Sequence, residues 1–375
     1  MSSSPHPVQG QLNAVHVLST AVGAHVRSLA AGLVARGVDV TVCGPAGIDA
    51  EYGFTAAGAR FSPIELGRSA AADAPAVAAL RSACAGASVV HAHGLRAGLL
   101  AALALGGRRV PLVVTWHGGE APARGRAGMM ARWLERRAVR AATVVLGVSS
   151  DLVDRARGHG AHDVRLAPAA VPRPPARPPL PPADGERRKQ RVRAEFGAEE
   201  RPLLLAVGRL EPSKGYDFLL TAAAHWADSE LRPLLVIAGE GQERAALEHR
   251  IDAEKLPAVL LGRRDDVPEL LSAADLVVLP SRWEGRPLIA QEALYAGVPL
   301  VATAVGGTPE LVGDAALLVP YGDPYVFARA VTDLLADQDR RTALAIAGRA
   351  QAATWPTEDD TVAQVLSVYD ELTGP

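Results

Sequence analysis

The feature that most constrains the fold is a repeated alternation of short valine- and leucine-rich runs with alanine-rich stretches. Short runs that are apolar throughout are typical of strands buried on both faces, as in a parallel sheet. The first set of such runs comprises residues 14–18, 38–43, 89–91, 110–115 and 143–148. The alanine-rich stretches between them predict the helices that connect parallel strands. The first half of the chain is therefore expected to be an α/β domain.

The alternation stops at a proline-rich segment and then restarts. Residues 172–182 are rich in proline and residues 187–193 are basic, a composition that favours extended or turning chain. A second set of strands is expected beyond it, at residues 203–207, 234–238, 259–261, 276–279 and 300–302. Because single cores rarely grow beyond about 250 to 300 residues, a chain of 375 residues predicts two domains.

These patterns divide the chain into regions. The predicted boundaries are an N-terminal Rossmann-like domain at 1–170, a Pro-rich and basic linker at 171–200, a C-terminal Rossmann-like domain at 201–355 and a closing helix at 356–375. In the closing helix, apolar residues recur at helical spacing: Val362, Val365, Leu366, Tyr369 and Leu372. That apolar face predicts a helix able to pack back on the N-terminal domain.

Composition excludes several classes of protein. The formal net charge of -2 gives no overall attraction to nucleic acid. Cys43 and Cys84 are too few for a disulfide framework or a thiolate metal site and suit a reducing compartment. No signal-peptide pattern precedes the first strand, and no apolar run has the length of a membrane span. We therefore expect a cytoplasmic protein without a membrane-spanning helix.

The first candidate site follows the strand at 203–207. Residues 208–215 read Gly-Arg-Leu-Glu-Pro-Ser-Lys-Gly and lead into a helix. In open α/β sheets, ligands bind at the carboxyl ends of strands, and helix N-termini there favour anions. Arg209 and Lys214 predict a diphosphate site, although a surface turn with two solvated cations fits the segment equally. The order of residues is not that of a P-loop, which disfavours ATP or GTP hydrolysis here.

The second candidate site follows the strand at 276–279. Glu284 lies on the expected loop and Glu292 lies eight residues later on the expected helix. Two acceptor-only carboxylates suit the binding of paired hydroxyl groups. The backbone N–H groups of residues 285–288 face the same place, with the exception of Pro287, which has none. The alternative interpretation is a solvated loop glutamate and a glutamate paired near its helix start.

These two segments together resemble retaining glycosyltransferases of family 4. The resemblance rests on residues 208–215 and 284–307, with Glu284 and Glu292 as a Glu-x7-Glu pair, and extends to Thr-Trp-His-Gly at 115–118 and to the run that begins at His25. It covers nearly the whole chain outside the linker. It implies a GT-B fold, in which two Rossmann-like domains face each other across a cleft.

The resemblance also implies roles for particular residues. His117 and Glu284 are the expected catalytic residues, both at the transferred sugar, and Arg209 and Lys214 bind the donor diphosphate. Glu292 holds the ribose hydroxyls, and Gly262 with Arg263 lines the base pocket. The complete expected donor-binding set is Gly23, Arg209, Lys214, Gly262, Arg263, Gly285, Arg286, Pro287, Leu288 and Glu292.

Two of these positions differ from the family pattern. Gly23 is a single glycine where the family usually has two adjacent glycines. Arg286 stands where the family often has an aromatic or aliphatic residue, and is either an additional phosphate contact or merely exposed. His117 itself, taken without the family, is equally a satisfied buried histidine.

The expected reaction is transfer of a hexosyl group from a nucleoside-diphosphate sugar, with retention of configuration and without metal or cofactor. The acceptor is a small molecule, a glycan or a lipid-linked compound. Two alternatives remain open: an epimerase or hydrolase on the same fold, which needs an acid/base pair at the sugar, and a non-catalytic nucleotide-sugar sensor.

Two further motifs have competing interpretations. His91 and His93 have a spacing compatible with metal ligands, but the expected role is structural or acceptor-side, because no cysteine or carboxylate partner is recognisable nearby. Arg124 to Arg140 interleaves arginines with Met129, Met130 and Trp133. It is either an amphipathic surface helix or a peripheral contact with the inner face of a membrane.

Overall fold

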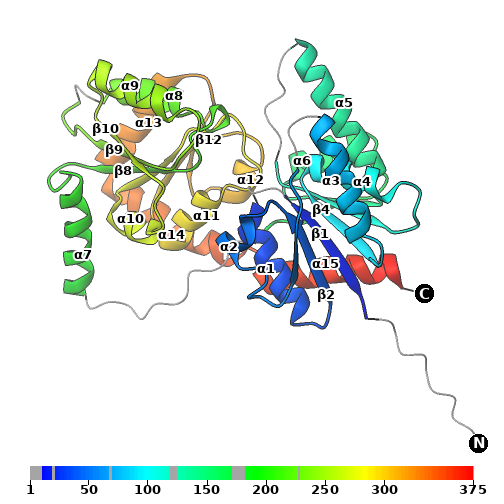
Figure 1. Cartoon of the computed structure of the whole chain (residues 1–375). Helices are drawn as coiled ribbons and strands as arrows, with labels where there is room; N and C mark the ends of the chain where they lie inside the picture. The colour runs from blue at the N-terminus through cyan, green and yellow to red at the C-terminus, as the bar shows by residue number, and fades with distance from the viewer. Residues whose placement is uncertain are drawn as a thin grey trace, which may run out of the picture. The chain divides into compact units, whose positions relative to one another are not determined.

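The computed structural model describes residues 11–18, 22–66, 70–118, 125–170, 182–226 and 229–374. The chain forms two compact units. The first consists of the described residues within Met1–Pro172 together with those within Pro356–Pro375, and the second of those within Arg173–Trp355. Both units are α/β, with a parallel sheet as their centre (Figure 1).

The described part of the first unit contains a seven-stranded parallel sheet in the order β3-β2-β1-β4-β5-β6-β7. Its strands are β1 (Asn13–Leu18), β2 (Asp39–Gly44), β3 (Arg60–Pro63), β4 (Val89–His93), β5 (Leu112–Trp116), β6 (Val144–Gly147) and β7 (Val164–Leu166). Its helices are α1 (Gly23–Val34), α2 (Ile48–Tyr52), α3 (Ala70–Ala83), α4 (Leu95–Leu105), α5 (Gly125–Ala141), α6 (Ser150–Gly158) and α15 (Glu358–Thr373). The order reverses between β1 and β4, the place where such sheets open a ligand crevice.

The second unit has, among its described residues, a six-stranded parallel sheet in the order β10-β9-β8-β11-β12-β13. Its strands are β8 (Leu203–Val207), β9 (Leu234–Ala238), β10 (Ala258–Gly262), β11 (Leu276–Leu279), β12 (Leu300–Thr303) and β13 (Leu317–Val319). Its helices are α7 (Pro182–Glu195), the 3-10 helix η2 (Pro212–Lys214), α8 (Tyr216–Ala224), α9 (Arg244–Glu254), α10 (Val267–Ala273), α11 (Leu288–Ala296), α12 (Thr308–Val312), α13 (Pro324–Ala336) and α14 (Gln338–Ala353).

The predicted strands are present in both units, and three additional strands lie at sheet edges. The central strands β4, β5, β6 and β9 are buried at every residue, which is why a continuous apolar run identifies them. The edge strands β3 and β7 are exposed or half-buried throughout, and β13 is buried only at Val319. An edge strand needs no apolar run, so the pattern gave no signal for these three.

The C-terminal helix α15 completes the core of the first unit. Val362, Val365, Val368 and Tyr369 of α15 belong to the same buried cluster as residues of α1 and β1. Gly32 of α1 allows the close approach, because a Cβ there would lie 2.4 Å from a methyl group of Val362. A capping box between Thr357 and Asp360 begins the helix. The first unit is therefore built from two separate stretches of sequence.

The predicted linker at 171–200 is only partly linker. Residues 171–181 lie outside the described structure, but residues 182–195 form α7, which packs on α10 of the second unit. Arg193 explains this packing, since its guanidinium donates to Asp275 at 2.9 Å and to the carbonyl oxygens of Ala273 and Arg201. The basic run at 187–193 thus contributes an anchored helix rather than an extended connection. None of the helices in the described part of the chain is both long and apolar enough to cross a bilayer.

Candidate active site

Two loops at the carboxyl end of the second sheet are held against each other through glycine. Residues 208–215 follow β8 and include η2, which ends at Gly215 with φ +69°. A Cβ at Gly215 would lie 2.2 Å from the carbonyl oxygen of Pro280, which follows β11. The backbone N–H of Arg282 also donates to the carbonyl oxygen of Ser213 at 2.9 Å. Because β8 and β11 are neighbouring strands, the two predicted segments form one site.

The centre of this site is an ion pair between two predicted residues. The Nζ of Lys214 lies 2.6 Å from Oε1 of Glu284, and the hydroxyl group of Ser281 donates to the same oxygen at 2.6 Å. Glu284 is 6% exposed. A buried carboxylate requires such partners, because removing it from water without compensation costs several kcal/mol. The sequence alternative of a solvated Glu284 is therefore wrong.

A third loop supports Glu284 from the side of β12. The backbone N–H of Gly307 donates to the carbonyl oxygen of Glu284 at 2.8 Å. Gly306 has φ +53°, and a Cβ there would lie 2.0 Å from the same carbonyl oxygen. The hydroxyl group of Thr303 donates to the carbonyl oxygen of Ser281 at 2.6 Å. Sequence reasoning assigned no role to Ser281, Thr303 or Gly306, although paired glycines after an apolar run were the available signal.

Glu292 and the start of α11 provide different functional groups. Glu292 lies on α11, half-buried, and burial raises the pKa of its carboxyl group. Pro287 is the N-cap of α11, so the backbone N–H groups of Leu288 and the next two residues have no partner within the helix, whereas Gly285 precedes the cap. The side chain of Leu288 is 55% exposed. This arrangement can attract an anion next to the Lys214–Glu284 pair.

The side chain of Arg286 is half-buried and packs on an aromatic ring. Its guanidinium carbon lies 5.5 Å from the ring centroid of Trp355, a cation–π contact. The side chain is half-buried, and burial lowers the pKa of the guanidinium while Glu310 opposes that shift. The interpretation of Arg286 as a merely exposed residue is wrong, because its side chain packs on an aromatic ring.

Two further predicted cations lie at the surface of the same sheet edge. Arg209 pairs with Glu211 at 2.8 Å and Arg263 pairs with Asp265 at 3.5 Å, with 59% and 67% of their side chains exposed. Exposed pairs of this kind contribute about 0 to 1 kcal/mol, so a ligand phosphate can take the place of the carboxylate at little cost. Gly262 has φ +77°, and a Cβ there would lie 2.8 Å from Oε1 of Glu240.

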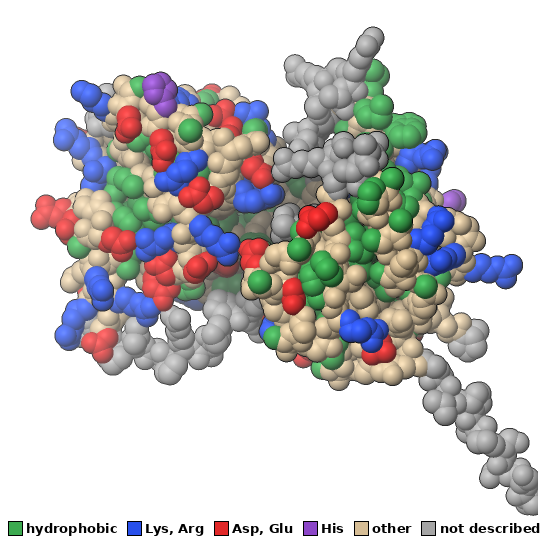
Figure 2. Space-filling view, viewed as in Figure 1, with side chains coloured by type: hydrophobic (Ala, Val, Ile, Leu, Met, Phe, Trp, Pro, Cys, Tyr) green, Lys and Arg blue, Asp and Glu red, His purple; other side chains and the backbone are tan. Residues whose placement is uncertain are grey.

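The charges over the rest of this unit are mixed. Figure 2 shows acidic and basic side chains interspersed on its visible face, without an extended field of one sign. This agrees with the small net charge of the chain. On this face, individual charged groups and backbone N–H groups at the loops would therefore attract an anion, rather than a long-range field.

The first unit holds the remaining two predicted residues. Gly23 begins α1 and is buried, and a Cβ there would lie 2.3 Å from the ring of Tyr52. A larger residue at this position would therefore require the ring of Tyr52 to shift. Ala21, in the same loop, lies outside the described residues. His117 follows β5 and is half-buried.

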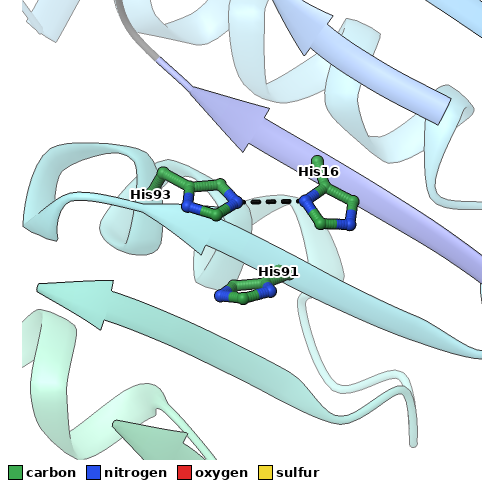
Figure 3. A group of neighbouring side chains, drawn as sticks. All are labelled: His16, His91 and His93. Atoms are coloured by element: carbon green, nitrogen blue, oxygen red, sulfur yellow. Dashed lines mark hydrogen bonds between the residues drawn. The ribbon is translucent and has the colours of Figure 1, made fainter. Parts of the chain in front are cut away.

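His117 is one member of a cluster of five histidines. Nε2 of His117 lies 3.3 Å from Nδ1 of His93, and Nε2 of His93 lies 3.0 Å from Nδ1 of His16. Figure 3 shows His16 and His93 hydrogen-bonded to each other, with His91 beside them. Burial lowers the pKa of His117 well below its ordinary value, so its imidazole is neutral near pH 7.

His16 and Tyr369 were missed by sequence reasoning, although both belong to this cluster. Sheet register places His16 on β1 directly opposite His91 on β4. Tyr369 of α15 approaches from the end of the chain, with its hydroxyl group 2.6 Å from Nδ1 of His91 and 3.3 Å from Nε2 of His16. Neither the strand alignment nor the meeting of Tyr369 with His91 and His16 can be read from local sequence.

Helix α5 carries the predicted membrane segment. Arg124 and the side chain of Arg126 lie outside what the structure describes. Along the described part of α5, Met129, Met130 and Trp133 are each more than half exposed. The guanidinium carbon of Arg137 lies 5.1 Å from the ring centroid of Trp133. Figure 2 shows hydrophobic side chains along this part of the surface, so the helix is amphipathic and its apolar face is exposed.

Comparison with known proteins identifies the family of the chain. Residues 20–172 match the model of a glycosyl transferase 4-like domain, and residues 188–351 match that of glycosyl transferases group 1. Alpha-maltose-1-phosphate synthase of Mycolicibacterium smegmatis is 31% identical over 315 residues, which are 77% of this chain and 80% of that enzyme. Alpha-D-kanosaminyltransferase of Streptomyces kanamyceticus is 34% identical over 224 residues, 58% of this chain and only 57% of that enzyme.

A solved structure shares the fold of the whole chain. HepE of Anabaena, crystallised in complex with UDP-glucose, superposes with a TM-score of 0.81 at 19% identity, over 96% of this chain and 100% of that one. The family models match residues in both units, and each unit has the parallel sheet of a Rossmann-like domain. The chain is therefore a member of the family 4-type glycosyltransferases with a GT-B fold.

Proposed function

We propose that the protein transfers a hexosyl group from a nucleoside-diphosphate sugar to an acceptor hydroxyl group, with retention of anomeric configuration and without a metal ion. The observation that carries this proposal is the Lys214–Glu284 pair, whose carboxylate is buried, beside the N-terminus of α11. A cation and a helix N-terminus suit a diphosphate, and the adjacent carboxylate suits sugar hydroxyls. The UDP-glucose bound to HepE supports the class of donor.

The chemistry requires stabilisation of the leaving group. As the bond to the anomeric carbon breaks, negative charge grows on the bridging phosphate oxygen and the sugar becomes oxocarbenium-like. Lys214, Arg209 and the first backbone N–H groups of α11 stabilise that charge from fixed positions. The departing phosphate takes the proton of the acceptor, which attacks from the same face. No protein nucleophile is required.

His117 and Glu284 orient the sugar. A neutral imidazole donates or accepts one hydrogen bond without bringing a positive charge close to an oxocarbenium-like carbon. Glu284, which pairs with Lys214, accepts from sugar hydroxyls. Glu292 binds the ribose hydroxyls, and Gly262 with Arg263 lines the base pocket. A small molecule, a glycan or a lipid-linked compound is the acceptor.

The exposed apolar face of α5 supports a lipid-linked acceptor as one specific case. Met129, Met130 and Trp133 can enter the interfacial region of a bilayer while neighbouring arginines contact anionic head groups. Sedimentation with anionic and with neutral vesicles tests this. Binding to anionic vesicles that Trp133→Ser weakens supports the contact, and equal binding of both proteins contradicts it.

The proposed transfer is tested by calorimetric titration with UDP-, GDP- and ADP-sugars in the presence of EDTA. Binding of one donor that Lys214→Ala abolishes supports the proposal and names the base. Product analysis then separates the rivals, because an epimerase or hydrolase releases epimerised or free sugar without an acceptor, and a sensor gives no turnover. Loss of binding in EDTA contradicts the metal-independent site.

A further inference from the structure

Three histidines from three elements of the first unit converge outside the donor-binding loops. His25 comes from α1, His93 ends β4 and His117 follows β5. The ring centroids of His25 and His117 are 5.1 Å apart, and those of His93 and His117 are 5.5 Å apart. Each ring offers a nitrogen, and these nitrogens all lie within 4.8 Å of one another. We call this group the His25–His93–His117 cluster.

The spacing in this cluster fits tetrahedral coordination. Zinc–nitrogen bonds of about 2.0 to 2.1 Å at tetrahedral angles separate ligand nitrogens by about 3.3 Å. Nδ1 of His93 and Nε2 of His117 are 3.3 Å apart. A nitrogen of His25 lies within 4.8 Å of those that His93 and His117 offer, so its ring would approach them when a cation binds. Three histidines with an open fourth position for water are a known form of zinc site.

The protonation states also suit a metal ligand. Burial lowers the pKa of His25 to about 4, and burial lowers the pKa values of His93 and His117 well below the ordinary value. All three rings are therefore neutral near pH 7, and neutral imidazole is the form that binds metal ions. His25 and His117 are half-buried rather than fully buried, which gives an ion a route of entry.

A series of hydrogen bonds begins at the other ring nitrogen of His93. Its Nε2 lies 3.0 Å from Nδ1 of His16, and Nε2 of His16 lies 3.3 Å from the hydroxyl oxygen of Tyr369. That hydroxyl group is 2.6 Å from Nδ1 of His91, and Nε2 of His91 is 2.6 Å from the hydroxyl oxygen of Thr115.

One arrangement of protons satisfies this whole chain while leaving Nδ1 of His93 unprotonated. His93 donates to His16, His16 donates to Tyr369, Tyr369 donates to His91, and His91 donates to Thr115. Each neutral group then supplies one proton to one bond. A metal-binding histidine characteristically has its other nitrogen hydrogen-bonded in this way.

The deeper trio of His16, His91 and His93 is a poorer site, although its nitrogens are also close. Both ring nitrogens of His16 and of His91 are already hydrogen-bonded, and both residues are completely buried. A cation there would break two hydrogen bonds of completely buried rings, whereas at the His25–His93–His117 cluster it would replace only the contact of Nδ1 of His93 with Nε2 of His117. In Figure 3, His16 comes from one strand and His91 and His93 come from the neighbouring strand, with the three rings beside one another.

We infer that His25, His93 and His117 bind one divalent transition-metal cation of the Zn²⁺ class, with water as the fourth ligand. All three ligands belong to the first unit, and none lies on the loops proposed to bind the donor diphosphate. One consequence rests on the proposed function: because His117 is also the residue proposed to contact the sugar, the bound cation excludes the sugar and inhibits transfer.

Cobalt(II) titration of the tag-free, chelator-treated full-length protein tests binding directly. Four-coordinate Co²⁺ gives intense visible bands, which are expected to rise to one equivalent and to disappear when Zn²⁺ displaces it. Tyr369→Phe is expected to weaken Co²⁺ affinity roughly 10- to 100-fold through the outer hydrogen bonds, and His25→Asn and His117→Asn by more. His249→Asn, on the exposed side of α9, is the matched control and is expected to bind normally.

Thermal unfolding without metal shows whether each variant is folded. His25 and His117 are half-buried, so their variants serve the test even if Tyr369→Phe does not fold. Absence of saturable binding by the wild type, or wild-type affinity in a folded His25→Asn protein, overturns the site. If one equivalent of Zn²⁺ binds but the rate of sugar transfer is unchanged, the metal site is supported. The proposed contact of His117 with the sugar is then contradicted.

Discussion

Among single residues, Lys214 and Glu284 contribute both to the stability of the fold and to the proposed donor site. Its carboxylate is buried, and it accepts from Lys214 and Ser281 at one oxygen. Removing one partner of a buried charge pair is more costly than the pair itself is worth, because the remaining charge is left without compensation. This pair therefore constrains both loops before any donor arrives.

Lys214→Ala is expected to reduce the transfer rate by roughly 10²- to 10³-fold, the usual effect of removing one fixed donor to a developing charge. It is also expected to lower the unfolding free energy, because Glu284 stays buried. Steady-state kinetics and urea unfolding measure the two effects. Arg329→Ala removes an exposed pair with Asp333 on α13 and is the control, expected to change neither. A wild-type transfer rate in Lys214→Ala would contradict the donor site.

Glu292 gives a prediction about pH. Burial raises the pKa of its carboxyl group above the ordinary value of 4.5. The folded state therefore binds the proton more tightly than the unfolded state, and the stability that this contributes is present below pH 4.5 and is lost as the pH rises through the raised value. Glu292→Gln is expected to gain stability relative to wild type between pH 4.5 and pH 7, measured by urea unfolding at both. A constant difference between the two proteins would contradict the raised pKa.

At the scale of elements, the site depends on glycines that let backbones meet. Gly215 and Gly53 have the same φ of +69°, and each follows a short helix. They differ in surroundings: a Cβ at Gly215 would lie 2.2 Å from the carbonyl oxygen of Pro280, whereas at Gly53 the nearest atom is 3.8 Å away, in Ala56. Alanine at Gly53 would therefore meet only the strain of the left-handed backbone, whereas alanine at Gly215 would also overlap a neighbouring backbone atom.

Both Gly215→Ala and Gly53→Ala are expected to lose about 1 to 2 kcal/mol of stability from the left-handed backbone. Gly215→Ala is expected to lose more and also to lose donor binding, because the loops after β8 and β11 are forced apart. Urea unfolding and donor titration compare the two variants. Equal losses of stability with intact donor binding would show that the close approach to Pro280 is unimportant.

At the scale of the whole molecule, the end of the chain completes the first unit. α15 supplies buried side chains to the core around α1 and hydrogen-bonds to the histidine cluster through Tyr369. Two ion pairs, Arg36 with Asp359 at 3.1 Å and Arg165 with Glu371 at 2.8 Å, lie along it. These exposed pairs add little, so the apolar face holds the helix.

A chain that ends at Trp355 is expected to keep donor binding by the second unit but to lose protection of β1 and α1 in the first. Hydrogen exchange followed by mass spectrometry measures protection, and calorimetry measures binding. Asp359→Asn, which breaks only an exposed ion pair, is the control and is expected to behave as wild type. Unchanged protection of β1 in the shortened chain would contradict this account of α15.

Much of the fold was predictable from sequence, because strands buried on both faces must be apolar throughout. The central strands, the two-sheet organisation and the segments that carry Lys214 and Glu284 were recognised in this way. The edge strands β3, β7 and β13 were not, since partly exposed strands leave no apolar run. Helix α7 was not, because its residue Arg193 is anchored by Asp275 and by the carbonyl oxygen of Ala273, both distant in sequence.

Local sequence is enough to set which segments become strands and helices, and which loops carry charged groups, because burial and backbone preference act over a few residues. Tertiary structure decided which of those groups meet. Lys214 reaches Glu284 across 70 residues, and Tyr369 reaches His91 across 278. Such contacts depend on strand order, register and helix packing, which the interactions of the whole chain determine and no local pattern records.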